Sequence, residues 1–266
     1  MNRRFFTLAG AALLAFTAFA TPNTAAVAAD HLKVGVSAGP YGDILREAAK
    51  LAAKEGLEVE VVEFSDWNLP NAALDAGEID LNSFQHKPYL DNQIAARNYK
   101  LVPLETAIAV PGGIWSAKYK SLNDLPEGAR LGIPNDPTNA TRALFLFRDA
   151  GVIELDPSVG TKAGILDITK NQKKVQFVEL DAAQLPRSLD DLDAAFVSNN
   201  YAHLAGLKRE DALIREKAES EWSIIFAARE DRKDDPLIRK YIAIYRSEPI
   251  RQFIEEKFKG SILPAF

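Results

Sequence analysis

The 266-residue sequence contains no cysteine and only three histidines. The absence of cysteine excludes disulfides, thiolate metal sites, thiol catalysis and a lipid carried by an N-terminal cysteine. A three-histidine zinc site would need every histidine of the chain, so we expect no metal, and no motif indicates another cofactor. Runs rich in lysine and arginine are also missing and the net charge is −5, which argues against nucleic acid as a partner.

Motifs of the common enzyme classes are missing as well. The sequence has no G-x-S-x-G elbow and no P-loop, and the spacing of Gly35, Gly39 and Gly42 does not fit a dinucleotide-binding turn. The acidic pair Asp190-Asp191 does not make an acid–base pair, because adjacent residues on a helix do not face one another. No residue is therefore nominated as catalytic, and we expect a protein that is not an enzyme.

The first residues have the layout of a secretory signal peptide. Asn2-Arg3-Arg4 supplies positive charge, Phe5–Ala20 is an uncharged apolar run, and Ala26-Val27-Ala28 offers small residues for cleavage. The apolar run is shorter than the about 20 residues of a membrane-spanning helix. We predict a cleavable signal at residues 1–28. Without a lipobox cysteine, we expect an exported product that is neither lipidated nor embedded in the membrane.

After the signal, strand-like and helix-like segments alternate. Such an order predicts parallel sheets with helices on their faces. The expected strands are 32–36, 58–64, 79–84, 100–104, 130–133, 175–180 and 194–197. The expected helices are 44–52, 70–76, 88–97, 137–150 and two C-terminal stretches between 234 and 258.

An internal similarity indicates two lobes built on one plan. Residues 62–70 have the spacing of residues 178–186, and each stretch leads through a short helix into a strand, at Ile79-Asp80 or at Leu192-Asp193. The alternative is chance, because strand–turn–helix units share turn chemistry. We favour two α/β lobes.

Aromatic and polar residues stand where the predicted strands end, which is where ligands bind in open parallel sheets. Trp67 follows the second strand, and Phe84, His86 and Tyr89 surround the end of the third. Residues 198–201 follow the last strand of the second lobe. Aromatic faces combined with amide and guanidinium donors fit a small zwitterionic ligand with an apolar side chain. Each residue alone could equally be a packing residue, so the interpretation depends on their shared position.

The segment 134–142 gives the clearest indication of the ligand's charge. Asp136 can cap a helix that starts at Pro137, and the free N–H groups of a helix start favour an anion. Arg142 lies about one turn further and can reach the same point, so a carboxylate is the expected guest. The alternative is that Arg142 is a surface residue and Asn139 only a cap.

These motifs resemble one family, the methionine-binding substrate-binding proteins of bacterial ABC importers (the MetQ/NlpA type). The matching text includes Phe84-Gln85-His86-Lys87-Pro88-Tyr89-Leu90, Pro134-Asn135-Asp136-Pro137-Thr138-Asn139 and Asn200-Tyr201-Ala202. The likeness covers nearly all of the chain after the signal. It implies an α/β, type II-like periplasmic-binding-protein clamp of two lobes, each a mostly parallel sheet flanked by helices.

The resemblance also implies a function. The clamp would close on L-methionine or a closely related amino acid in the periplasm and deliver it to a membrane permease with a cytoplasmic ATPase. Arg142 would hold the carboxylate with Asn139 in support, and the aromatic residues would line the thioether pocket. The eight residues expected to bind the ligand are Trp67, Phe84, His86, Tyr89, Asn139, Arg142, Ser198 and Asn200.

Two departures from the family pattern keep other ligands open. Ser198 stands where the family often has an asparagine, and Ile114-Trp115-Ser116 is also unusual. A different amino acid, a methionine derivative or a short peptide is the alternative, and a periplasmic enzyme or an adhesive surface protein would belong to other classes. We expect residues 29–107 with 227–266 to form lobe 1 and residues 108–226 to form lobe 2.

Overall fold

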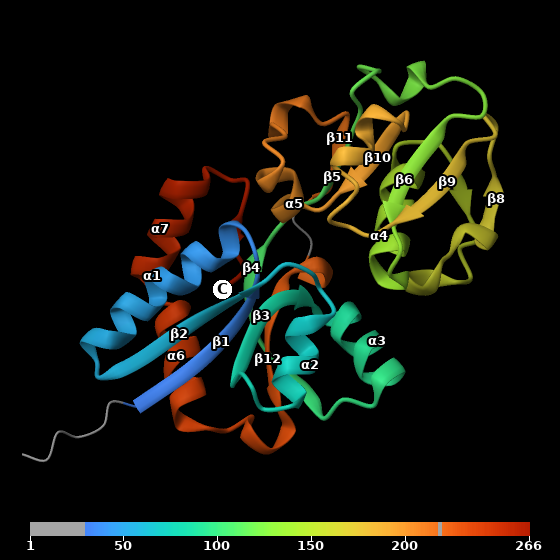
Figure 1. Ribbon diagram of the computed structural model, residues 1–266. Helices are drawn as coiled ribbons and strands as arrows, with labels where there is room; N and C mark the ends of the chain where they lie inside the picture. Colours follow the sequence, from blue (N-terminus) through green and yellow to red (C-terminus); the bar gives the residue numbers. More distant parts are fainter. Residues whose placement is uncertain (1–29, 218–219) are drawn as a thin grey trace, which may run out of the picture.

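The computed structural model describes residues 30–217 and 220–266, so the predicted signal at 1–28 lies outside the described residues. The described chain forms two α/β lobes, each built on one main sheet (Figure 1). Every helix in these ranges is too short or too polar to count as a candidate membrane span.

Lobe 1 contains a six-stranded sheet of order β13-β4-β12-β3-β1-β2. Helices α1, α6 and α7 cover one face, and α2 and α3 cover the other. The strands are β1 Asp30–Ser37, β2 Leu57–Phe64, β3 Leu81–His86, β4 Leu101–Ala109, β12 Ile224–Arg229 and β13 Leu263–Pro264. The helices are α1 Pro40–Lys54, α2 Leu69–Asp75, α3 Lys87–Arg97, α6 Pro236–Tyr245 and α7 Glu248–Phe258.

Alternation along β12 explains how one strand serves both faces of this sheet. Ile224 and Phe226 join the core under α1, whereas Ile225 and Ala227 join the core under α2 and α3. Successive side chains of a strand point to opposite faces, so an unbroken apolar run is what a strand covered on both sides requires.

Lobe 2 contains a five-stranded sheet of order β11-β5-β10-β6-β9, with α4 and α5 packed around it, and a small two-stranded sheet of β7 and β8. The elements are β5 Gly113–Trp115, β6 Arg130–Pro134, α4 Pro137–Asp149, β7 Glu154–Leu155, β8 Ile168–Lys170, β9 Gln176–Leu180, β10 Ala194–Val197, α5 Asn199–Leu204 and β11 Ile214–Arg215. Short 3-10 turns are η1 Leu122–Asp124, η2 Gly160–Lys162, η3 Ile165–Asp167, η4 Arg187–Asp190, η5 Arg209–Asp211, η6 Ser220–Trp222 and, in lobe 1, η7 Glu230–Arg232.

The two lobes repeat one plan, as the internal similarity predicts. The strand order β2-β1-β3-β12 of lobe 1 matches β9-β6-β10-β5 of lobe 2. Equivalent contacts recur: the N–H of Lys33 donates to Asp80 Oδ2 at 2.8 Å, and the N–H of Arg130 donates to Asp193 Oδ2 at 2.8 Å. Each aspartate stands directly before one strand, β3 or β10, and thus ties the start of that strand to its parallel neighbour, β1 or β6.

Both sheets mix parallel and antiparallel pairs, whereas the sequence favoured mostly parallel ones. Strand β1 is parallel to β2 and β3, and β6 is parallel to β9 and β10. The pairs of β12 with β3 and β4, and of β5 with β10, are antiparallel. The chain leaves lobe 1 after β4 and returns to it with β12, so these two strands run in opposite directions.

Candidate functional site

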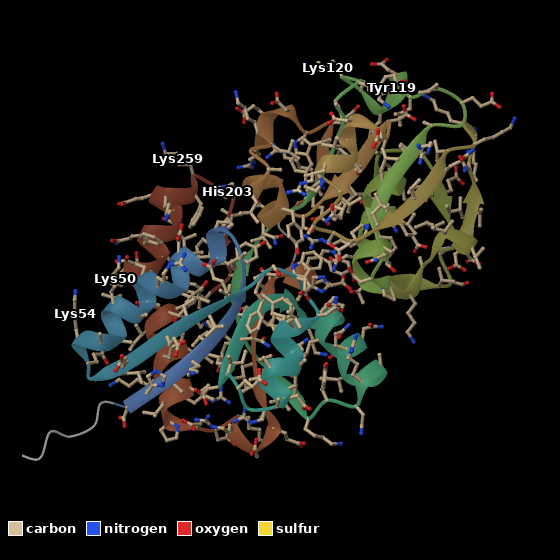
Figure 2. All side chains as sticks on the ribbon, in the orientation of Figure 1. Lys50, Lys54, Tyr119, Lys120, His203 and Lys259 are labelled. Atoms are coloured by element: carbon tan, nitrogen blue, oxygen red, sulfur yellow. The ribbon has the colours of Figure 1, made fainter. Side chains whose placement is uncertain are left out.

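A cavity between the lobes brings all eight predicted site residues together. It measures about 20 Å³, room for little more than a single water molecule. Figure 2 shows side chains of both lobes meeting between the two sheets, while the labelled Lys54 and Lys120 lie at opposite outer ends of the molecule. The lining residues are Tyr41, Trp67, Phe84, Gln85, His86, Tyr89, Val110, Asn139, Arg142, Ser198, Asn200 and Ile224.

Strand and helix ends deliver these side chains, as expected from the chain order. In lobe 1, Phe84 and His86 end β3 and Tyr89 lies in the first turn of α3. In lobe 2, Asn139 and Arg142 lie in the first two turns of α4, and Ser198 stands between β10 and α5. The carboxyl ends of the central strands in both sheets therefore face one cavity.

His86 bridges the two lobes in its neutral form. Its Nδ1 accepts a hydrogen bond from the N–H of Tyr89 at 3.1 Å, which caps α3. Since Nδ1 accepts, the proton lies on Nε2, which donates to Asn139 Oδ1 at 3.0 Å in lobe 2. Burial and the nearby positive charge of Arg142 lower the pKa of His86 from 6.5 to about 3, so the ring is uncharged at neutral pH.

Asn139 is a bridging residue whose side-chain amide is already engaged. Its Nδ2 donates to both carboxylate oxygens of Asp136 at 3.1 Å, while its Oδ1 faces His86. Asp136 also caps α4 by accepting from the N–H of Asn139 at 2.9 Å. The expectation that this helix start attracts an external anion is therefore corrected, because the half-buried carboxylate of Asp136 already occupies it. Desolvation by burial raises the pKa of Asp136.

Arg142 is buried, with 4% of its surface exposed, which excludes the alternative of a surface residue. Glu216 holds it in a two-point ion pair: Nε donates to Oε1 at 2.7 Å and Nη2 donates to Oε2 at 2.6 Å. Nη2 also donates to the carbonyl of Val110 at 3.1 Å. Nη1 makes no hydrogen bond within the described part of the chain, so it is the nitrogen that a carboxylate in the cavity can take.

Four aromatic side chains form a wall along the cavity. The ring of Tyr89 lies edge-on to those of Trp67, Phe84 and His86, with centroid distances of 6.2, 6.1 and 6.2 Å. The Tyr89 hydroxyl donates to the carbonyl of Trp67 at 3.1 Å. The Trp67 ring also contacts Tyr201 of lobe 2, at a centroid distance of 5.1 Å. The wall is thus preformed in lobe 1 and touches lobe 2 at its edge.

Three buried polar atoms that line the cavity have no hydrogen-bond partner in the described structure. They are Trp67 Nε1, Ser198 Oγ and Asn200 Nδ2. Buried polar groups are almost always hydrogen-bonded, so their occurrence in one cavity needs an explanation. A polar ligand seated between them supplies it.

Comparisons with known proteins agree with this geometry. The sequence profile described as NlpA lipoprotein matches residues 32–266. The chain belongs to the NlpA lipoprotein family. Within this family, the D-methionine-binding lipoprotein MetQ of Yersinia pestis is 43% identical over 237 residues, which is 88% of each chain.

Solved structures related to the family share the fold. A nutrient binding protein from Burkholderia cenocepacia bound to methionine is 46% identical with a TM-score of 0.85, over 88% of this chain and 100% of its own. An ABC transporter periplasmic substrate-binding protein from Coxiella burnetii is 40% identical, with the same TM-score and the same shares. The family resemblance and the two-lobed α/β fold are therefore confirmed.

The family corrects one prediction from the sequence, that the exported protein is not lipidated. Several relatives are named lipoproteins, which are lipidated and membrane-anchored, so the prediction was wrong by this comparison. The prediction depends on the absence of cysteine in the 266 residues. That absence does not by itself decide how a member of this family is attached.

Several residues of the cavity were not predicted. Tyr41 follows the first strand and could have been found by the same strand-end rule. Gln85 lies inside the quoted motif, but its amide is fully used by Asn71 and Asn82, so it fastens β3 to α2. Glu216, which is not part of the cavity lining, carries no sequence signal, because it meets Arg142 only through the fold. Val110 and Ile224 also went unpredicted, and they lie where the chain leaves lobe 1 and returns to it.

Proposed function

We propose that this protein captures methionine, or a closely related amino acid, between its lobes and delivers it to an ABC importer. The observation that carries the proposal is the cavity that joins a buried arginine and three unpaired polar atoms to an aromatic wall. The names of the Yersinia and Burkholderia relatives support methionine as the ligand. A periplasmic location agrees with the name of the Coxiella structure.

The two ends of the cavity match the two ends of an amino acid. Arg142 Nη1 would take the carboxylate, and Ser198 and Asn200 would contact the polar atoms beside it. Phe84, His86 and Tyr89 would surround the side chain, since a thioether packs favourably against aromatic rings. Burial of such a side chain contributes about 1.5–3 kcal/mol and a charged hydrogen bond about 1.5–3 kcal/mol, so tight binding needs both lobes.

Binding would proceed by movement of the lobes. The cavity volume of about 20 Å³ does not admit an amino acid without separation of its walls. A ligand that contacts both lobes favours the arrangement in which they meet, because it binds that arrangement better than an open one. The closed protein would then be recognised by a membrane permease that works with a cytoplasmic ATPase.

We infer binding without chemical turnover. Both ring nitrogens of His86 are engaged, and its pKa of about 3 makes it a poor base at neutral pH. The Ser198 hydroxyl has no basic partner within the described chain, so the usual activation of a serine nucleophile is not available.

The lobe boundaries remain a proposal, with residues 29–107 and 227–266 in lobe 1 and residues 108–226 in lobe 2. The membership of β4 and β12 in the first sheet supports it. The proposed crossings fall within these two strands, because β4 extends to Ala109 and β12 begins at Ile224.

Calorimetry tests the proposed function. The protein is unfolded in denaturant to remove bound solutes, refolded, and titrated with the twenty amino acids and with both enantiomers of methionine. We expect one or both methionine enantiomers to give the tightest binding. Norleucine, which lacks the sulfur, should bind more weakly, and methioninamide, which lacks the carboxylate, should bind far more weakly.

N-acetyl-methionine and methionine-containing dipeptides complete the titration. The cavity lining of the described chain includes no aspartate or glutamate to pair with an ammonium group, and two of the three unpaired atoms, Trp67 Nε1 and Asn200 Nδ2, are donors. If an N-acylated or peptide ligand binds more tightly than free methionine, that ligand is the substrate in place of free methionine. Absence of binding by every acid in the set would refute the proposed function.

A further inference from the structure

Glu216 lies behind the arginine of the cavity and connects it to the crossing between the lobes. Its Oε2 accepts from the N–H of Gly112 at 2.6 Å, and its own N–H donates to the Gly112 carbonyl at 3.0 Å. Its carboxylate holds Arg142 at two points, and Arg142 in turn donates to the carbonyl of Val110. Val110 and Gly112 lie between β4 and β5, where the chain passes from lobe 1 to lobe 2.

The side of the guanidinium that Glu216 takes is the side away from the ligand cavity. Arg142 lines both that cavity and a larger outer one of about 510 Å³, whereas Glu216 lines only the outer one. Nε and Nη2 are used by Glu216, and Nη1 is not. The ion pair therefore fixes the guanidinium plane from behind and leaves one edge for a carboxylate.

Charge balance gives this arrangement a second consequence. The side chains of Arg142 and Glu216 are 4% and 10% exposed, and a buried cation without a counter-charge is strongly destabilising. The rings of Phe196 and Trp222 lie 5.8 and 5.5 Å from the Arg142 guanidinium carbon and add favourable cation–π contacts. Glu216 thus balances the charge of Arg142 at the cavity even when no ligand is bound.

The contact between Glu216 and the crossing backbone also depends on Gly112. A Cβ at this position would lie 2.6 Å from the ring of Phe196 and 3.2 Å from Glu216 Oε2. The crossing backbone can therefore approach the carboxylate only because residue 112 is a glycine.

We propose that Glu216 is the positioning residue of the ligand-binding arginine and fixes it to the crossing between the lobes. The proposal rests on the proposed function, because it assumes a ligand carboxylate at Arg142. It requires that the loss of Glu216 weaken recognition of the carboxylate specifically, while contacts with the rest of the ligand are retained.

The test compares L-methionine with L-methioninamide in calorimetric titrations of the wild type, Glu216→Ala and Glu216→Gln. We expect both substitutions to lower the affinity for methionine at least about tenfold, since a neutral group at 216 cannot hold the guanidinium at two charged points. The affinity for methioninamide should change by less than about threefold, because it lacks the group that Arg142 recognises.

Glu105→Ala is the matched control. Glu105 pairs with Arg239 at 2.7 Å between β4 and α6, outside the cavity, so its loss should leave both affinities unchanged. Equal losses for methionine and methioninamide in the Glu216 variants, or no loss at all, would overturn the positioning role. If the wild type binds another acid but not methionine, methionine is replaced as the ligand, and the comparison is made with that acid and its amide; if it binds no acid, the proposed function fails instead.

Discussion

Replacement of Arg142 by alanine is expected to lower the affinity for methionine at least about a hundredfold. The substitution removes the charged donor that faces the cavity, and a hydrogen bond to a charged group contributes about 1.5–3 kcal/mol. It also leaves the carboxylate of Glu216 buried without its cation. This unpaired negative charge should further oppose binding of the negatively charged ligand carboxylate.

The same substitution should reduce the free energy of unfolding. Removal of one partner of a buried ion pair costs about 3–5 kcal/mol. Calorimetry at a temperature where the variant is folded, combined with thermal unfolding, separates the two effects. Arg142→Lys should bind with intermediate affinity, because an ammonium keeps the charge but cannot hold two carboxylates in a planar fork.

Arg148→Ala is the control on the same helix. Arg148 pairs with Asp149 at the surface, so its replacement by alanine should leave the affinity for methionine unchanged. Methionine binding by Arg142→Ala at wild-type strength would remove the arginine from the ligand site.

The free energy of unfolding should fall by roughly 2 kcal/mol between about pH 6.5 and pH 4.5 because of His86. In the unfolded chain this histidine takes up a proton near pH 6.5, whereas in the folded protein its pKa is about 3. The unfolded state therefore binds more protons in this interval, and stability decreases as the pH falls. A proton on Nδ1 would also abolish the acceptor that caps α3.

Chemical denaturation of the wild type and His86→Asn over this pH range measures the effect. Asparagine at residue 86 can still cap α3 but does not titrate, so the variant should show a shallower slope. Both proteins keep Asp136, whose raised pKa acts in the opposite direction, and the difference between their slopes isolates the histidine. Identical slopes would contradict the neutral, lobe-bridging histidine.

Much of the site could be predicted because it is encoded locally. The end of β3 and the start of α3 are continuous in sequence, so Phe84, His86 and Tyr89 could be assigned to one place from strand and helix signals alone. The same holds for Asn139 and Arg142 in α4. The strand-end rule then places the residues of both lobes at a common cavity.

What could not be predicted depends on contacts between distant segments. Glu216 lies 74 residues from Arg142 in sequence and becomes its partner only when β11 pairs with β5. Strand β12 reads as a plain apolar run, and its antiparallel place between β3 and β4 follows from the return of the chain to lobe 1. The sequence predicts the cap of Asp136, but the same carboxylate also fills the anion site at the start of α4, which the sequence assigns to a ligand.

The structure of the protein crystallised with methionine would test the central claim most directly. The account predicts the ligand carboxylate at about 2.7–3.2 Å from the Arg142 guanidinium, with Glu216 still on the opposite edge. It also predicts the sulfur among the rings of Phe84, His86 and Tyr89. A ligand whose carboxylate lies away from Arg142, or that binds outside the space between the lobes, would contradict the account.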